Sequence, residues 1–393
     1  MPKNRFMTLT VILLTISLTA GCAINSTTNH ASTKEVPAVV THSDDYYQKL
    51  GLSRSRVEPW EDGMRTTGGK GSYEWWYFDS TLKEGSTLVV IFYTKDSIRP
   101  DRPLEPRLAI EFTRPDGTSL HRELRVKASD FSAAKDHCEV RIGANTFKGD
   151  LHDYTLHVDV DGVQADIKLH GTVPPWRPAT GHAFFKDKKK HYFAWLPSVP
   201  QGKVEATLTI DGQSRQVTGV GYHDHNWGDL SLLKLLHNWY WGRAQIGNYS
   251  VIASYMIAAD KYGNTPMSAF MLARDGQIIA DDFTKVRFSA NSIYTDPHTS
   301  KPVAGVIVYD YDDGIDHYRI TFQRERDLVR ARFIDNLHGF KYLLAKLVNF
   351  DGAYLRFTGK ATVERFDRDR IVETVDEKGA VWELMYFGHA PKQ

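Results

Sequence analysis

The stretch Gly219–Asp229, GVGYHDHNWGD, carries two histidines around an aspartate, followed by an amide and an indole. Side chains of an extended strand alternate between two faces. One face would therefore carry His223, His225 and Trp227, and the other Tyr222, Asp224 and Asn226. Histidine titrates near neutral pH, and a neighbouring carboxylate raises its pKa and holds it protonated. This stretch is therefore a candidate proton-handling site.

Two other interpretations of the stretch remain open. A His-x-His pair on one strand is a known way to hold zinc, with His237 as a third ligand. Alternatively, Asn226, Gly228 and Asp229 form a polar turn, and the histidines hydrogen-bond to nearby carbonyls.

A second cluster of chemically informative residues is Tyr73–Asp79, YEWWYFD. As a strand it would be aromatic on both faces, with one acid on each, so it needs cover on both sides or a cavity on one. The aromatics are then either core residues or a wall that stabilises a cation, at roughly 0.5–2 kcal/mol per ring. Further aromatics that could complete such a wall are Trp239, Tyr240, Trp241 and Tyr255.

The elements that position these residues are short β-like runs. Period-two alternation is clear in Tyr154–Val160, and Asp161–Gly162 is typical of a hairpin turn. Such runs recur to the C-terminus, and the one helix-like piece is Phe340–Val348. The pattern predicts an all-β protein with two β-barrel-like halves joined near the histidine stretch.

The N-terminus predicts export and a lipid anchor. Lys3 and Arg5 precede an apolar run that ends at Gly21–Cys22, which is typical of a lipoprotein signal peptide over residues 1–21. Ala23 follows the cysteine and favours the outer membrane, facing the periplasm, over the inner membrane. Residues 22–55 are rich in polar side chains and are predicted to be a flexible tether.

Composition restricts the partners. The 393 residues carry a formal net charge of +1, without the basic character typical of nucleic-acid-binding proteins. The two cysteines are Cys22 and Cys138, so lipidation of the first leaves none for an intrachain disulfide.

Several motifs occur in one order along the chain: EWWYFD, HYFAWLPSVPQGKVEATLTIDG, VTGVGYHDHNWG, NWYWGRA and VWELMYFG. Together they resemble the carotenoid 1,2-hydratase (hydroxyneurosporene synthase) and AttH-like family over about residues 60 to 390. The resemblance implies two lipocalin-like antiparallel β-barrel domains, here assigned to residues 56–235 and 236–393. For hydratase members it also implies cofactor-independent addition of water to a carbon–carbon double bond.

The resemblance also implies roles for individual residues. His225 would be the acid, Trp227 the ring that stabilises a cation, and Tyr255 a tyrosine on the following strand. An acidic residue is expected two positions after that tyrosine, where this chain has Ile257. The carboxylates that would have to substitute are Asp224, Asp229 or Asp79.

The resulting hypothesis is a lipid-anchored hydratase or isomerase that acts on a long apolar isoprenoid or polyene without a cofactor or metal. Its catalytic residues would be His225, Asp224, Trp227 and Tyr255, and its substrate-binding residues Trp75, Trp76, Tyr77, His223, Asn226 and Trp241. The alternatives are a non-catalytic carrier of an apolar ligand and a zinc-dependent hydrolase. For the hydratase or isomerase and for the carrier, the expected partners are an apolar small molecule and the membrane, which the protein contacts through lipidated Cys22. No nucleic acid is expected as a partner.

Overall fold

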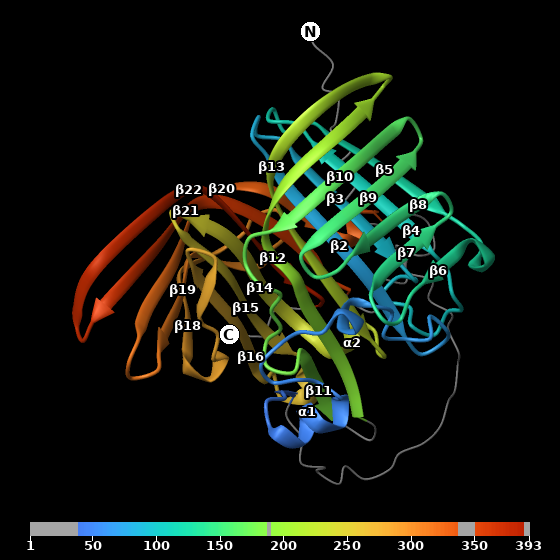
Figure 1. Ribbon diagram of the computed structural model, residues 1–393. Coiled ribbons are helices and arrows are strands. Elements are labelled where there is room, and N and C mark those ends of the chain that lie inside the picture. Colours follow the sequence, from blue (N-terminus) through green and yellow to red (C-terminus); the bar gives the residue numbers. More distant parts are fainter. Residues whose placement is uncertain (1–37, 187–189, 337–349, 389–393) are drawn as a thin grey trace.

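The computed structural model describes residues 38–186, 190–336 and 350–388, and most of this part of the chain is β-strand (Figure 1). The predicted signal peptide, Cys22, most of the tether and the helix-like piece at 340–348 lie outside the described residues. Of the described helices, none combines the length and apolar character needed to cross a membrane.

The first sheet has thirteen antiparallel strands, ordered β5-β4-β3-β2-β13-β12-β10-β9-β8-β7-β6, with β11 paired to β12 and β1 to β11. Their bounds are β1 Val39–Val40, β2 Tyr73–Leu82, β3 Thr87–Tyr93, β4 Arg107–Thr113, β5 Ser119–Arg125, β6 Phe131–Ala133, β7 Cys138–Ile142, β8 Asn145–Gly149, β9 Asp153–Val160, β10 Val163–Gly171, β11 His182–Lys186, β12 Lys190–Ile210 and β13 Gln213–Gly228.

The second sheet has nine antiparallel strands, ordered β17-β16-β15-β14-β22-β21-β20-β19-β18. Their bounds are β14 Leu236–Ile246, β15 Tyr249–Ala258, β16 Pro266–Arg274, β17 Gln277–Ala280, β18 Val286–Thr295, β19 Pro302–Asp312, β20 His317–Arg332, β21 Ala353–Asp367 and β22 Arg370–Tyr386. The short helices are α1 (Asp44–Leu50), which follows β1 in the chain, and α2 (Leu232–Leu235), which connects β13 to β14. The predicted all-β class is confirmed, and the strands form two antiparallel sheets.

Local sequence explains the hairpins. In β9 every second residue is buried, as the alternation predicted. Asp161 and Gly162 both have positive φ, at 44° and 78°, and connect β9 to β10. Two successive residues with positive φ characterise the tight turn whose twist matches that of the flanking strands, which is why Asp-Gly is favoured there.

Three large hydrophobic clusters of the described residues stabilise the fold. One lies inside the first sheet around Phe78 and Val158, and another inside the second sheet around Phe322 and Trp382. The third draws on both sheets, because it includes Trp195 of β12 and Met256 of β15. The outer face of each sheet therefore packs on the other sheet, as their neighbouring positions in Figure 1 show.

The last eight residues of β13, 221–228, are all buried. A strand in an antiparallel sheet usually has one solvated face. In β13, one face meets the core of the first sheet and the other meets the second sheet. The histidine stretch occupies this doubly covered segment.

Candidate active site

The two faces of β13 enter different environments. Asp224 lies opposite Tyr77 of β2, and Asn226 lies between Trp75 of β2 and Trp195 of β12. These side chains share the face that is turned toward the second sheet. His223 and His225 point the opposite way, into the first sheet, where each ring contacts core aromatics.

A cavity of about 270 Å³ lies between the two sheets. Aromatic and other apolar side chains form most of its wall, with a small number of polar groups, which is the usual character of a small-molecule site. The first sheet contributes Trp75, Tyr77, Phe193, Trp195, Asp224 and Asn226, and the second contributes Trp239, Trp241, Met256, Tyr354, Arg356, Glu383 and Met385.

Asp224 is the carboxyl group of this cavity whose surroundings best suit it to proton transfer. Burial raises its pKa to about 6, although Tyr222, Trp195, His223 and Asn226 all act in the opposite direction. Oδ2 accepts from the Tyr222 hydroxyl at 2.7 Å and the Trp195 indole at 2.8 Å, and Oδ1 accepts from the Asn226 amide at 2.6 Å. A carboxylate has about four lone-pair positions. The three hydrogen bonds use three of these positions and hold Asp224 in place. The fourth position remains for taking or giving a proton.

The second sheet places a polar row on the opposite wall. Trp241, Glu383 and Arg356 are consecutive neighbours across β14, β22 and β21. Glu383 accepts from the Tyr354 hydroxyl at 2.8 Å and from the Trp239 indole at 3.1 Å. Burial raises the pKa of Glu383, although the hydrogen bonds from Tyr354 and Trp239 and the charge of Arg356 act in the opposite direction.

The inward face of β13 forms a buried polar network. His223 Nε2 lies 3.1 Å from Asp62 Oδ2, and His225 Nε2 lies 2.7 Å from Glu74 Oε1. The Tyr154 hydroxyl also donates to Asp62, at 2.5 Å. Burial disfavours the ionised Asp62, but the histidines and this hydroxyl outweigh burial and lower its pKa. The network ties the short turn η1 (Pro59–Asp62) to β2 and β13.

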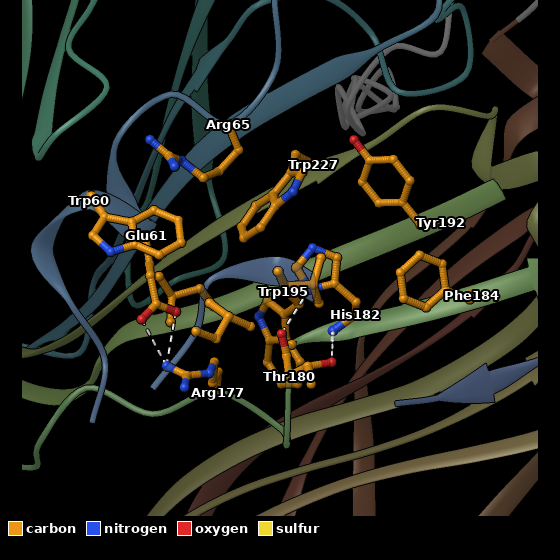
Figure 2. Close-up of a pocket in the computed structure, with 14 residues that line it drawn as sticks. Trp60, Glu61, Arg65, Arg177, Thr180, His182, Phe184, Tyr192, Trp195 and Trp227 are labelled. Carbon is orange, nitrogen blue, oxygen red and sulfur yellow. Dashed lines mark hydrogen bonds and ion pairs between the residues drawn. The ribbon is translucent and has the colours of Figure 1, made fainter. Parts of the chain in front are cut away.

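A second pocket, of about 330 Å³, lies on this other side of β13, and Trp227 lines it (Figure 2). Several of its polar side chains are already hydrogen-bonded within the protein. Glu61 accepts from Arg177 at 2.9 Å, and His182 Nδ1 donates to the Thr180 carbonyl at 2.8 Å. Burial lowers the pKa of His182 to about 4, so this imidazole is neutral at pH 7.

The structure brings five of the predicted site residues together around the cavity between the sheets: Asp224, Asn226, Trp75, Tyr77 and Trp241. It places His223, His225 and Trp76 in the interior of the first sheet, with fully buried side chains. These three do not line the cavity between the sheets, because the strand alternation turns them the other way.

Tyr255 lies on the core face of β15, where its ring stacks on Phe288 at 4.0 Å. Ile257 shares that face, whereas Ser254 and Met256 line the cavity. The absence of an acid at position 257 therefore does not alter the wall of the cavity.

The predicted zinc trio is not assembled. His237 bonds to its neighbour Asn238 at 2.6 Å and lies on β14 of the second sheet. The ligand atoms of Asp62, Cys138 and His223 do lie within 4.8 Å of one another. Asp62 and His223 already hydrogen-bond to each other there, and burial raises the pKa of the Cys138 thiol well above its usual range.

Sequence reasoning missed the residues that the second sheet and η1 contribute, namely Arg356, Tyr354, Glu383 and Asp62. One signal was available for the first two. At the start of β21, Tyr354, Arg356 and Thr358 alternate with the apolar Ala353, Leu355 and Phe357, which indicates that this part of the strand has one polar face.

Comparisons with known proteins agree with this architecture. A family described as "DA-like: Diels-Alderase-like" matches residues 21–333. The quinolone epoxide rearrangement protein asqO of Emericella nidulans is 24% identical over 75% of this chain and 83% of its own. The hydroxyneurosporene dehydrogenase of Chlorobaculum tepidum is 30% identical over 44% of this chain and 53% of its own. The crystal structure of a putative AttH from Nitrosomonas europaea superposes with a TM-score of 0.55 at 14% identity, covering 86% of this chain and 99% of its own.

Proposed function

Because the chain belongs to the Diels-Alderase-like family, we propose that it is an enzyme that rearranges or hydrates a carbon–carbon double bond of an apolar small molecule in the cavity between its sheets. The resemblance to AttH-like proteins and carotenoid hydratases that the motifs indicated agrees with this membership. The names of the relatives, an epoxide rearrangement protein and a hydroxyneurosporene dehydrogenase, support small organic substrates.

The observation that carries the proposal is the environment of Asp224. A carboxyl group with a pKa of about 6 is protonated in a useful fraction of molecules near neutral pH, which an ordinary surface aspartate is not. Its position on an aromatic wall places this proton beside an apolar ligand. General acids perform best when their pKa is close to the working pH.

The proposed reaction begins when Asp224 transfers its proton to one carbon of the double bond. The π electrons form the new C–H bond, and the adjacent carbon becomes a cation. Faces of Trp75, Trp195 and Trp241 stabilise this cation. Asp224, now a carboxylate, can remove a proton from a carbon next to the cation, which gives an isomer. Alternatively, it takes a proton from a water molecule while the oxygen of that water bonds to the cation, which gives an alcohol.

Deuterium incorporation tests this function directly. Neurosporene, lycopene and methyl farnesoate are incubated separately with the purified protein in D₂O, and substrate and product are analysed by mass spectrometry. We expect at least one of them to gain a carbon-bound deuterium in the product. If a compound quenches the tryptophan fluorescence, and so binds, but none of the three compounds gains deuterium, proton transfer from Asp224 is contradicted. That result would favour the alternative function, which is a carrier.

We also propose that the mature protein is held at the bacterial outer membrane through lipidated Cys22. The proposal rests on the charged residues, apolar run and small residues that precede this cysteine. A membrane position suits a protein whose ligand is apolar, and several acyl chains provide stable anchoring.

Metabolic labelling with an alkyne fatty acid in a Gram-negative host tests the anchor. We expect the wild type and Cys138→Ser to carry the label and Cys22→Ser to lose it completely. Cys138 is the matched control, because it is the other cysteine of the chain and is buried in the fold. Label that persists in Cys22→Ser would refute the anchor.

A further inference from the structure

Arg356 is a cation on the wall of the cavity between the sheets, and its guanidinium has no direct partner there. Within the described part of the chain, no hydrogen-bond or ion-pair partner lies in reach of its guanidinium. Burial disfavours its charge, but the nearby Tyr354, Tyr77, Asp79 and Glu383 raise its pKa, so it stays protonated. Arg356 is partly exposed to this cavity, so a ligand in the cavity can reach its donors. The space in front of Arg356 is therefore a site for an acceptor oxygen.

The other arginine of the cavity shows what a compensated guanidinium looks like in this protein. Arg107 pairs with Asp96 at 2.8 Å and with Glu123 at 2.9 Å, and it stacks over Tyr93 at 3.9 Å. All of these partners come from the first sheet or the turn after β3. Arg107 is thus a structural cation. Arg356 differs from it because the N–H groups of its guanidinium remain available to a ligand.

Three carboxyl groups interact electrostatically with Arg356, namely Asp79, Glu383 and Glu111, and none forms an ion pair with its guanidinium. Asp79 accepts from Arg243 and, at 3.1 Å, from the Tyr77 hydroxyl. Glu383 accepts from Tyr354 and Trp239. These carboxyl groups keep the surroundings of Arg356 from being strongly positive, which favours a single acceptor group over a multiply charged anion such as a phosphate.

We propose that Arg356 binds a carbonyl or carboxyl oxygen at one end of an otherwise apolar substrate, so that the substrate is an oxygenated polyene or isoprenoid and not a pure hydrocarbon. The inference rests on the proposed function, because it concerns the same cavity. A guanidinium offers several donors in one plane, which suits the two lone pairs of such an oxygen. The rest of the wall is aromatic and accepts the hydrocarbon part.

This anchor also limits which double bond reacts. Tyr77 is close to both polar groups, since it is the strand neighbour of Asp224 and interacts electrostatically with Arg356. A head group held by Arg356 would therefore lie in the part of the cavity that also holds the acid. The double bond that Asp224 protonates is then close to the oxygenated end of the substrate, and not at the far end of the chain.

Equilibrium binding of three matched polyenes tests whether Arg356 binds an oxygenated head group, and it does not require turnover. Retinoic acid, methyl retinoate and axerophtene share one hydrocarbon skeleton and end in a carboxylate, an ester carbonyl and a methyl group. Binding is followed by quenching of the protein's tryptophans, four of which line the cavity: Trp75, Trp195, Trp239 and Trp241. We expect at least one of the two oxygenated ligands to bind about tenfold or more tightly than axerophtene, as a hydrogen bond to a charged donor provides.

The variant Arg356→Met keeps the length and apolar contacts of the side chain and removes the donors. We expect it to bind axerophtene as the wild type does and to lose the preference for the oxygenated ligands. The control Arg326→Met removes one exposed positive charge from the neighbouring strand β20 and should retain the preference.

The outcomes distinguish a failure of the Arg356 proposal alone from a failure of both proposals. A preference for the acid over the ester identifies a carboxylate head, and equal affinity identifies a carbonyl oxygen; both support the anchor. Equal binding of all three ligands, or a preference that survives in Arg356→Met, would overturn it and leave the acid chemistry of Asp224 standing. If none of the three ligands binds, the cavity does not accept a polyene, and both the anchor and the proposed function fail.

Discussion

Replacing Asp224 by asparagine is expected to reduce turnover at least 100-fold while leaving the fold intact. Asparagine has nearly the same shape, and its carbonyl oxygen can still accept from the Tyr222 hydroxyl and the Trp195 indole. It has no acidic proton to transfer. General acid catalysis typically contributes a factor of roughly 10² to 10⁴. The measurement is the initial rate of deuterium incorporation into whichever of the three D₂O substrates reacts.

The pH dependence provides a second signature of the same group. Asp224 donates only when it is protonated, and its pKa is about 6. The kcat/KM of the wild type should therefore be highest below pH 6 and fall about tenfold per pH unit above it. The control Asp159→Asn removes an exposed carboxyl group on β9 and should keep both the rate and the profile. A rate that is unaffected by Asp224→Asn, or that rises with pH through this range, would refute the acid assignment.

The sequence predicted the secondary structure well because its signals are local. Alternation in Tyr154–Val160 and the Asp-Gly turn after it depend on neighbours in the chain, and both appear in the structure. The same alternation correctly divided the histidine stretch into two faces. Local patterns therefore identified which residues act together.

Local patterns did not identify which face of β13 meets a cavity. All residues from 221 to 228 are buried, so polarity does not distinguish the side that faces the core from the side that faces the second sheet. The distinction depends on contacts distant in sequence, such as Asp62 with His223, 161 residues apart. Arg356 and Glu383 join the site only because the second sheet packs against the first.

The same alternation gives β13 two separate tasks. Its outward residues, Asp224 and Asn226, line the cavity, and its inward residues, His223 and His225, bind the η1 turn and β2. A carboxyl group keeps a raised pKa only if its surroundings stay dry and fixed. The inward network therefore supports the outward acid by holding one strand in place.

The variant His225→Ala separates these two tasks, and we expect it to lower the free energy of unfolding by about 3–5 kcal/mol. His225 is fully buried and hydrogen-bonds to Glu74, and its ring centroid lies 4.6 Å from that of the stacked Trp76 and 4.7 Å from that of the tilted Trp227. Alanine would leave a cavity and remove one partner of a buried carboxylate. Denaturant unfolding measures the loss, and His157→Ala, at a half-exposed position of β9, should change stability by less than about 0.5 kcal/mol.

A glutamine at the same position distinguishes a structural role from the acid role that the sequence motif predicted. The amide of His225→Gln can still donate to Glu74, but it cannot transfer a proton to a substrate. If His225 supports the strand, this variant recovers part of the lost stability, and its turnover per folded molecule stays close to that of the wild type. If His225 is the acid, turnover is absent in both variants, however stable the glutamine protein is. The burial of His225 behind Trp227, on the opposite face of β13 from the cavity, favours the first result.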